Sequence, residues 1–225
     1  MSEFYLVRHG QASFGAENYD KLSELGKQQS EWLGEYFADR QIAFDQILTG
    51  TLTRHKETAD GIRSALPTDV PVDALPELNE FDFEGLARAY LHQYPDARPA
   101  EDAPRAEFYR LLKSAMLEWA ANTLPEEHLN ESWQQFEHRV ALAINHVREQ
   151  LHSKRVLIVS SGGAIAMLLS HVLGFGPEQV VNLNLQIKNT SFSHFYFNPL
   201  QVRLSNFNNV PHLDLPERVE AVTYS

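Results

Sequence analysis

The sequence contains no cysteine. This absence excludes a disulfide framework, a thiolate nucleophile and a cysteine metal site. A chain without cysteine also fits a reducing compartment, so we expect a cytoplasmic protein.

Long hydrophobic runs are missing as well. The longest apolar stretches have the length of a strand or a helix, whereas a membrane span needs ~18 or more such residues. The opening segment, MSEFYLVRHG, has neither a basic n-region nor a long apolar h-region. We therefore expect a soluble protein with no signal peptide and no membrane contact.

Basic residues are few relative to acidic ones. There are 19 Lys and Arg residues against 30 Asp and Glu residues, and the formal net charge is −11. Duplex binding depends on clustered cations that neutralise phosphates, so this balance argues against a nucleic-acid partner. Any phosphate that the protein binds should be held by a few local residues.

Strand-like and helix-like patterns alternate along the chain. Apolar or alternating runs predict strands at 4–7, 44–48, 156–159, 192–197 and 202–207. Helical spacing of apolar residues predicts helices after Ser23, over 51–66, over 108–119, over 133–151, and from about Gly163 to Gly174. Strands separated by helices indicate an α/β fold with a largely parallel sheet, and 225 residues suffice for a single domain.

Several boundaries carry local signals of their own. Ser23 is a plausible N-cap, and Ser132 with Gln135 fits a capping box. The proline-interrupted stretch VPVDALPEL is an edge strand at best.

Two polar turns follow predicted strands, where ligands bind in open α/β sheets. Arg8, His9 and Gly10 leave the first strand, and the turn SSGG at 160–163 leaves a later one. An imidazole can attack phosphorus while a guanidinium binds the phosphoryl oxygens. The alternative for Arg8, His9 and Gly10 is an ordinary polar patch at the end of a strand.

Five motifs in a fixed order favour the chemical interpretation. They are LVRHG, LSELGKQQ, TGTLTRHKETA, ELNEFDFEGL and IVSSGGAIAMLL. In this order they resemble the histidine phosphatase superfamily, the branch that includes the phosphoglycerate mutases, over nearly the whole chain.

The resemblance implies a three-layer α/β/α sandwich and a phosphohistidine intermediate. By position in the motifs, His9 matches the nucleophile, Arg8 and Arg54 match the phosphate-binding arginines, and Glu80 matches the general acid and base. Glu77, Asp82 and Glu84 compete with Glu80 and are expected to be solvated or capping.

The SSGG turn departs from the family pattern. The usual motif reads V-S-H-G-G or V-T-H-G-G, and Ser161 stands where it has histidine. With Gly162, Ser161 is expected to border the phosphate, as a weak donor, as a relic in a non-catalytic binding protein, or as a turn residue. Loss of a comparable donor in other enzymes costs about 10²- to 10³-fold in rate. Ser160 is expected to be structural.

Four further residues are candidates for contact with the substrate or with the catalytic residues: Gln11, Ser13, Asn18 and His55. For the first three, a plain polar loop is the equal alternative. His55 follows Arg54 directly, and adjacent helical positions point about 100° apart. It supplies the missing imidazole only if the helix entry is irregular; the alternative is a solvent-facing helical histidine.

The segment 86–129 is expected to be an inserted helical cap that covers the pocket and selects the substrate. Its aromatic and cationic residues suit that role, and they suit packing against the main domain equally well: Tyr90, Tyr94, Arg98, Arg105, Phe108, Tyr109 and Arg110. No ligand follows from them.

The expected function is hydrolysis of a phosphomonoester through His9. The expected partner is a phosphorylated small molecule or a phosphoprotein, without a metal or other cofactor, and the oligomeric state is open. A mutase reaction and non-catalytic binding of a phosphorylated ligand are the alternatives. A serine hydrolase is remote, because VSSGGA lacks the leading glycine of G-x-S-x-G.

Overall fold

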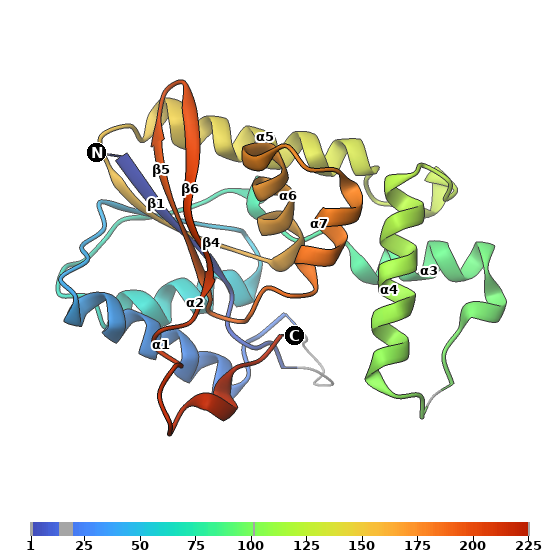
Figure 1. The fold of residues 1–225 in the computed structure, drawn as a ribbon, viewed down its shortest axis with the longest axis horizontal. Coiled ribbons are helices and arrows are strands. Elements are labelled where there is room, and N and C mark those ends of the chain that lie inside the picture. The colour runs from blue at the N-terminus through green and yellow to red at the C-terminus, as the bar shows by residue number, and fades with distance from the viewer. Residues whose placement is uncertain (1, 14–19, 101, 225) are drawn as a thin grey trace.

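One mixed six-stranded sheet organises the computed structural model, which describes residues 2–13, 20–100 and 102–224 (Figure 1). The strand order is β3-β2-β4-β1-β5-β6, in which β1, β2, β3 and β4 run parallel and β5 and β6 run antiparallel to their neighbours. The strands are β1 Ser2–Arg8, β2 Gln46–Thr49, β3 Val72–Ala74, β4 Arg155–Ser160, β5 Phe192–Asn198 and β6 Gln201–Asn209.

Helices cover both faces of the sheet. They are α1 Glu24–Asp39, α2 Thr53–Ser64, α3 Phe83–Gln93, α4 Arg105–Ala120, α5 Trp133–Gln150, α6 Gly162–Leu173 and α7 Pro177–Asn184. Helices α1 and α2 lie on one face and α5 and α6 on the other, while α3 and α4 stand beside the sheet (Figure 1). The expected α/β sandwich with a mostly parallel sheet is confirmed.

Alternation along β1 builds two hydrophobic cores. Phe4 and Leu6 point into the core that contains the buried faces of α5 and α6. Tyr5 and Val7 point into the core beneath α1 and α2. A central strand buried on both faces reads as a continuous apolar run, which is why FYLV predicts it so clearly.

The predicted helix ends are confirmed. The Ser23 side chain accepts a hydrogen bond from the Gly26 N–H, and Ser132 and Gln135 form the complete capping box of α5. Helix α6 ends at Gly174, whose φ of 74° is the left-handed conformation that glycine adopts without strain. The edge position of β3 also agrees with its proline-flanked sequence.

Two helices were not predicted. Helix α3 begins at Phe83, three residues before the expected cap segment, and buries Gly85, Leu86 and Ala89. Two of these residues are small, so no wide stripe of large apolar side chains marks the helix. Helix α7 has only 8 residues, which is too short for a clear hydrophobic period.

Within the described part of the chain, no helix has both the length and the apolar character needed to cross a membrane.

The end of β1 packs closely against the first turn of α1. A Cβ atom placed on Gly26 would lie 2.1 Å from the Gln11 carbonyl oxygen, and one on Gly10 would lie 2.4 Å from the Gly26 carbonyl oxygen. Both obstacles are backbone atoms, so no side-chain rotation relieves the overlap. This contact positions the loop that follows β1.

We predict that Gly26→Ala lowers the free energy of unfolding by about 2 kcal/mol or more, because overpacking against backbone forces the two segments apart. Urea denaturation measures the change. Gly176→Ala is the matched control, since its Cβ would meet nothing nearer than a side-chain oxygen at 3.7 Å. Equal stabilities for the two variants would contradict the role of the contact.

Candidate active site

Three parallel strands bring the polar turns together at one edge of the sheet. Arg8, at the end of β1, is in register with Ser160 at the end of β4, and Thr49 of β2 is in register with Val159. The segments that follow these strands therefore converge. They carry His9, the start of α2 and the SSGG turn.

His9 is held in one orientation and is 4% exposed. Its backbone N–H donates to the Ser160 carbonyl at 2.9 Å, and its carbonyl accepts from the Asn189 amide at 3.0 Å. The ring Nδ1 lies 2.7 Å from the Gly10 carbonyl oxygen. A carbonyl can only accept, so Nδ1 carries the proton and, in the neutral ring, Nε2 keeps its lone pair.

The surroundings keep this imidazole neutral. Burial is the main reason that the pKa of His9 lies well below 6.5, and the guanidinium groups of Arg54 and Arg8 lower it further. A neutral histidine with a defined tautomer is the form that acts as a nucleophile.

Two arginines flank His9, and both are nearly buried. Arg54, 7% exposed, forms an ion pair with Asp20, with 2.8 Å between Nη1 and Oδ1. Asp20 also accepts from the backbone N–H of Thr53 and so caps the start of α2. Arg8 donates to the carbonyls of Ile187 and Tyr224. The protein thereby fixes both guanidinium groups before any ligand binds.

The spacing of Arg54 and Thr58 in the motif TGTLTRHKETA has a structural explanation. Thr58 lies one helical turn after Arg54 and donates to its carbonyl at 2.7 Å. The same hydroxyl accepts from the Gly10 N–H at 3.0 Å. Thr58 therefore ties the loop after β1 to α2, and it brings His9 and Arg54 to the same site.

Glu80 reaches the start of α6. One carboxylate oxygen accepts from the Gly163 N–H at 3.0 Å, and the other accepts from the Phe81 N–H at 3.2 Å. A Cβ on Gly163 would lie 2.3 Å from Glu80 Oε1. The second glycine of SSGG is thus needed for the carboxylate to approach the helix N-terminus.

Two of the three competing acidic residues have other partners. Asp82 is the N-cap of α3 and accepts from the Gly85 N–H at 2.9 Å. Glu84 is 66% exposed and lies 3.9 Å from Arg88. Neither of them, nor Glu77, lines the cavity described below, whereas Glu80 does.

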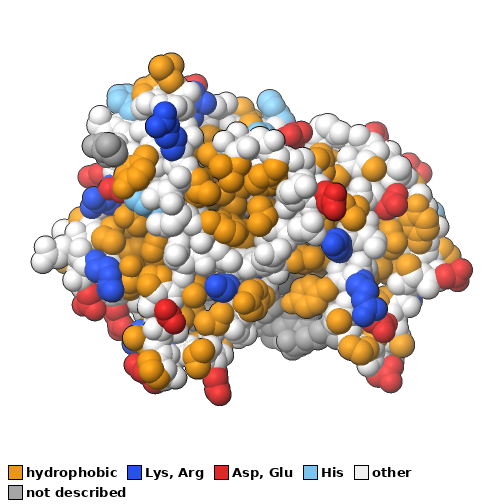
Figure 2. All heavy atoms as spheres, in the orientation of Figure 1, with side chains coloured by type: hydrophobic (Ala, Val, Ile, Leu, Met, Phe, Trp, Pro, Cys, Tyr) orange, Lys and Arg blue, Asp and Glu red, His pale blue; other side chains and the backbone are white. Residues whose placement is uncertain are grey.

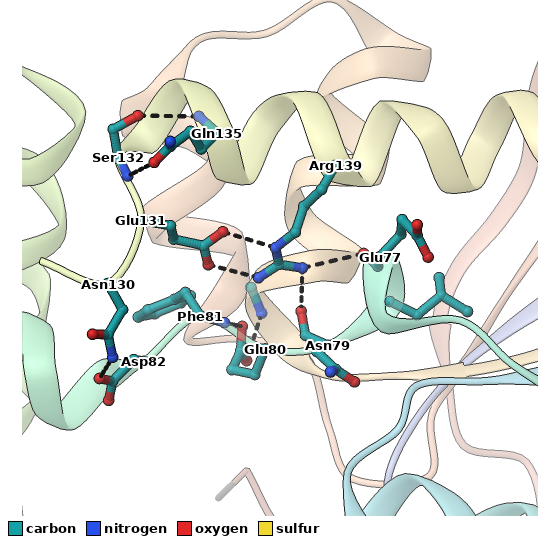
Figure 3. Close-up of polar contacts among 12 residues, drawn as sticks. Glu77, Asn79, Glu80, Phe81, Asp82, Asn130, Glu131, Ser132, Gln135 and Arg139 are labelled. Atoms are coloured by element: carbon teal, nitrogen blue, oxygen red, sulfur yellow. Dashed lines mark hydrogen bonds and ion pairs between the residues drawn. The ribbon is translucent and has the colours of Figure 1, made fainter.

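Sequence reasoning missed a residue that supports the Glu80 segment. Arg139 of α5 donates to the carbonyls of Glu77 and Asn79, at 3.2 and 2.7 Å, and forms two hydrogen bonds with the Glu131 carboxylate (Figure 3). The arginine therefore holds the backbone just before Glu80. Its place in the middle of an amphipathic helix offered no signal of this contact.

A cavity of about 880 Å³ opens onto these residues, and Arg8, His9, Arg54 and Glu80 all line it. The candidates Gln11 and Ser13 line it as well.

Both of these loop residues are held by neighbours. The Gln11 side chain accepts from the Ser23 hydroxyl, and the Ser13 hydroxyl donates to the Leu22 carbonyl. Asn18 lies outside the described residues.

His55 is fully buried, so the alternative of a solvent-facing helical histidine is wrong. Its Nε2 lies 2.6 Å from the Ser161 hydroxyl, and its ring centroid lies 5.7 Å from that of His9. Arg54 and His55 both reach the site because they belong to the first turn of α2, where the helix points its end at the sheet edge. The first turn is also tightened by a bond from the His55 N–H to the Leu52 carbonyl.

The SSGG turn is buried. Ser160 donates to the Leu78 carbonyl at 2.7 Å, a structural contact. Ser161 has no exposed surface, and neither it, Gly162 nor His55 lines the cavity. The Ser161 hydroxyl does not cap α6; its partner is His55.

Among the described residues, no group of three or more His, Asp or Glu side chains is arranged to hold a metal ion.

Comparison with known proteins matches residues 4–210 to the histidine phosphatase superfamily (branch 1). The probable phosphoglycerate mutase GpmB of Salmonella arizonae is 27% identical over 227 residues, which cover 96% of this chain and 97% of the relative.

Solved structures share the fold. A mutant phosphoserine phosphatase from Entamoeba histolytica in complex with phosphoserine has a TM-score of 0.67 at 19% identity, covering 95% of this chain and 100% of that one. A putative alpha-ribazole-5'-P phosphatase from Escherichia coli K-12 has a TM-score of 0.68 at 21% identity, covering 93% and 98%.

Buried histidines link stability to pH. Burial, with smaller contributions from Arg54 and Arg218 respectively, lowers the pKa of His55 and of His212 to about 3. In the unfolded chain both would titrate near 6.5. Between these values the unfolded state binds protons that the folded state does not, so stability falls as the pH drops below about 6.5.

We predict that each of these histidines costs about 2 kcal/mol of stability when the pH falls from 7.5 to 5.0. His212→Gln removes the titrating group, and its amide can still reach the Thr190 hydroxyl, which lies 2.9 Å from His212 Nε2. The variant should therefore lose about 2 kcal/mol less than the wild type over this interval, measured by urea denaturation. Identical pH dependence of the two proteins would refute the prediction.

Proposed function

Because the chain belongs to the histidine phosphatase superfamily, branch 1, we propose that it is a phosphatase that hydrolyses phosphomonoesters through a phosphohistidine on His9. The observation that carries this proposal is the buried, neutral imidazole whose Nδ1–H is committed to the Gly10 carbonyl, between two ordered arginines. This arrangement presents a nucleophilic nitrogen where an anion can bind.

In the first step, Nε2 of His9 attacks phosphorus and forms the N–P bond. The bond between phosphorus and the ester oxygen breaks, and the carboxylic acid form of Glu80 donates its proton to the departing alcohol oxygen. Arg8 and Arg54 bind the phosphoryl oxygens and stabilise their charge as the bonds change.

In the second step, water attacks the phosphoryl group. The Glu80 carboxylate takes a proton from the water, the N–P bond breaks, and inorganic phosphate leaves. The hydrogen bonds that Glu80 accepts from Gly163 and Phe81 hold the carboxylate in place for both proton transfers. Arg139 acts through the Glu80 backbone and is therefore a positioning residue.

We also propose that His55 provides the imidazole that the family pattern has at position 161. A histidine at 161 in the rotamer of Ser161 would place its Cγ near the present hydroxyl oxygen. Because that oxygen lies 2.6 Å from His55 Nε2, the new ring would enter the space that the His55 ring now fills. The His55 ring centroid lies 5.7 Å from that of His9, and neither His55 nor Ser161 lines the cavity, so we propose that this imidazole acts by positioning the nucleophile.

A mutase reaction is the second candidate, because the curated relatives carry the name probable phosphoglycerate mutase. A mutase must shield its phosphohistidine from water and bind a sugar-acid carboxylate. The described cations that line the cavity are Arg8 and Arg54, both assigned here to the phosphate. Non-catalytic phospholigand binding is the third candidate, and it requires that no phosphoenzyme forms.

The first test measures phosphate release from 4-nitrophenyl phosphate and from butyl phosphate between pH 5 and 8. We predict that His9→Ala abolishes both activities. Glu80→Gln should lower kcat/KM for butyl phosphate by about 10²- to 10⁴-fold, and kcat/KM for 4-nitrophenyl phosphate much less, because nitrophenolate leaves without a proton and the later water step does not enter kcat/KM. Because burial and the two arginines hold the pKa of His9 well below 6.5, protonation of His9 should cause no loss of wild-type activity as the pH falls from 8 to 6.5.

A quench of the wild type in alkaline detergent with labelled substrate should trap a phosphohistidine that His9→Ala lacks, because the N–P bond hydrolyses in acid and survives in base. The exposed His138→Ala is the control and should behave as the wild type. Equal rates for wild type and His9→Ala would overturn the mechanism, and isomerised phosphoglycerate without phosphate release would establish the mutase.

The second test moves the histidine from position 55 to position 161. We predict that His55→Ala lowers kcat by about 10²-fold because His9 loses its positioning. Ser161→His should also be impaired because two rings compete for one space, and the double variant should recover most of the loss. Thermal melts and KM measured alongside separate this effect from unfolding. If His55→Ala keeps the wild-type kcat, or the double variant is no better than the worse single one, the exchange is refuted.

A further inference from the structure

The cavity changes character away from the phosphate end. Beyond Arg8, His9 and Arg54, its walls are formed mainly by apolar side chains from the segment after Glu80, from α3 and α4 and from the end of α7. They include Phe81, Phe83, Phe108, Leu111, Leu112 and Leu185. The polar end and the apolar end belong to one continuous cavity.

The size of this cavity exceeds the needs of a small phosphorylated acid. Its volume of about 880 Å³ lies near the upper end of sites that enclose drug-sized ligands, roughly 300–1,000 Å³. The phosphate occupies only the end between the two arginines, so most of the space faces the alcohol part of the substrate.

Helix α4 exposes aromatic side chains at this cavity. Phe108 is 47% exposed and Tyr109 is 41% exposed, and both line it. Hydrophobic side chains border the hollow between the sheet and the α3–α4 part in Figure 2. When a ligand covers exposed aromatic rings beside an anion-binding site, the burial of apolar surface lowers the free energy of the complex.

The charges of the lining side chains also favour an apolar leaving group. Among the described lining residues, the charged side chains Arg8, Arg54, Glu80 and Glu24 come from the main domain, and those contributed by α3 and α4 carry no charge. A substrate carboxylate at the apolar end would lose water without gaining a partner, which is costly. An uncharged group does not carry this desolvation cost.

We propose that the substrates are phosphomonoesters of uncharged, largely apolar alcohols, with an alkyl chain or aromatic ring against α3 and α4. This inference rests on the proposed phosphatase function and specifies the substrate class for the same site. The phosphoryl group binds between Arg8 and Arg54, and the leaving group extends over Leu111 and Phe108.

The test uses n-alkyl phosphates from ethyl to hexyl, whose leaving groups have similar pKa values, so that chain length is the main variable. kcat/KM should rise about two- to fourfold with each methylene. An ω-carboxyalkyl phosphate of matched length should lose this gain. In parallel, n-alkylphosphonates, which cannot be hydrolysed, report binding alone by calorimetry, and their affinity should follow the same trend.

Variants locate the effect. Leu111→Ala and Phe108→Ala should flatten the dependence on chain length. Leu142→Ala is the matched control, because Leu142 is exposed on α5 and does not line the cavity, and it should keep the wild-type slope.

The two proposals fail in different ways. Phosphonate affinity that rises with chain length, without turnover of any phosphate, would retain the apolar site and overturn the phosphatase. Turnover with a flat or falling dependence on chain length, or no binding of any phosphonate, would overturn the apolar substrate class. If kcat/KM still rises with chain length in both Leu111→Ala and Phe108→Ala, the apolar substrate class is also overturned.

Discussion

The hydrogen bond between His9 Nδ1 and the Gly10 carbonyl is the interaction on which the candidate site depends. It determines which ring nitrogen carries the proton and which keeps a lone pair. The bond requires the loop after β1 to have one conformation, and its partners come from distant segments: Thr58 holds Gly10, and Asn189 and Ser160 hold His9. Helix α1 packs so closely on this loop that only glycine fits at the contact.

The site concentrates polar groups in a place that water barely reaches. Two guanidinium groups and two imidazoles are nearly or fully buried at one sheet edge, and burial drives both imidazoles towards the neutral state. Arg54 pairs with Asp20, and Arg8 donates to two backbone carbonyls. Burying these charged groups lowers the free energy of unfolding of the ligand-free protein. In return, the site needs no reorganisation when an anion binds.

Residues 55 and 161 show how the fold joins two distant motifs. The first turn of α2 brings the His55 imidazole to the Ser161 hydroxyl after β4, with 2.6 Å between Nε2 and Oγ. This contact is invisible along the chain, since residues 55 and 161 are far apart in sequence. It becomes evident because the first turn of α2 faces the SSGG turn across the end of β2.

Local sequence patterns were enough to predict the α/β class, the burial of the central parallel strands, most helix ends and the identity of the motif residues. These features depend on local periodicity, capping and turn chemistry, which neighbouring residues encode. Three contacts became visible only in the folded chain: His55 against Ser161, Asp20 with Arg54, and Arg139 with the backbone before Glu80. Those contacts join distant segments, and no local pattern specifies which side chains meet when the layers pack.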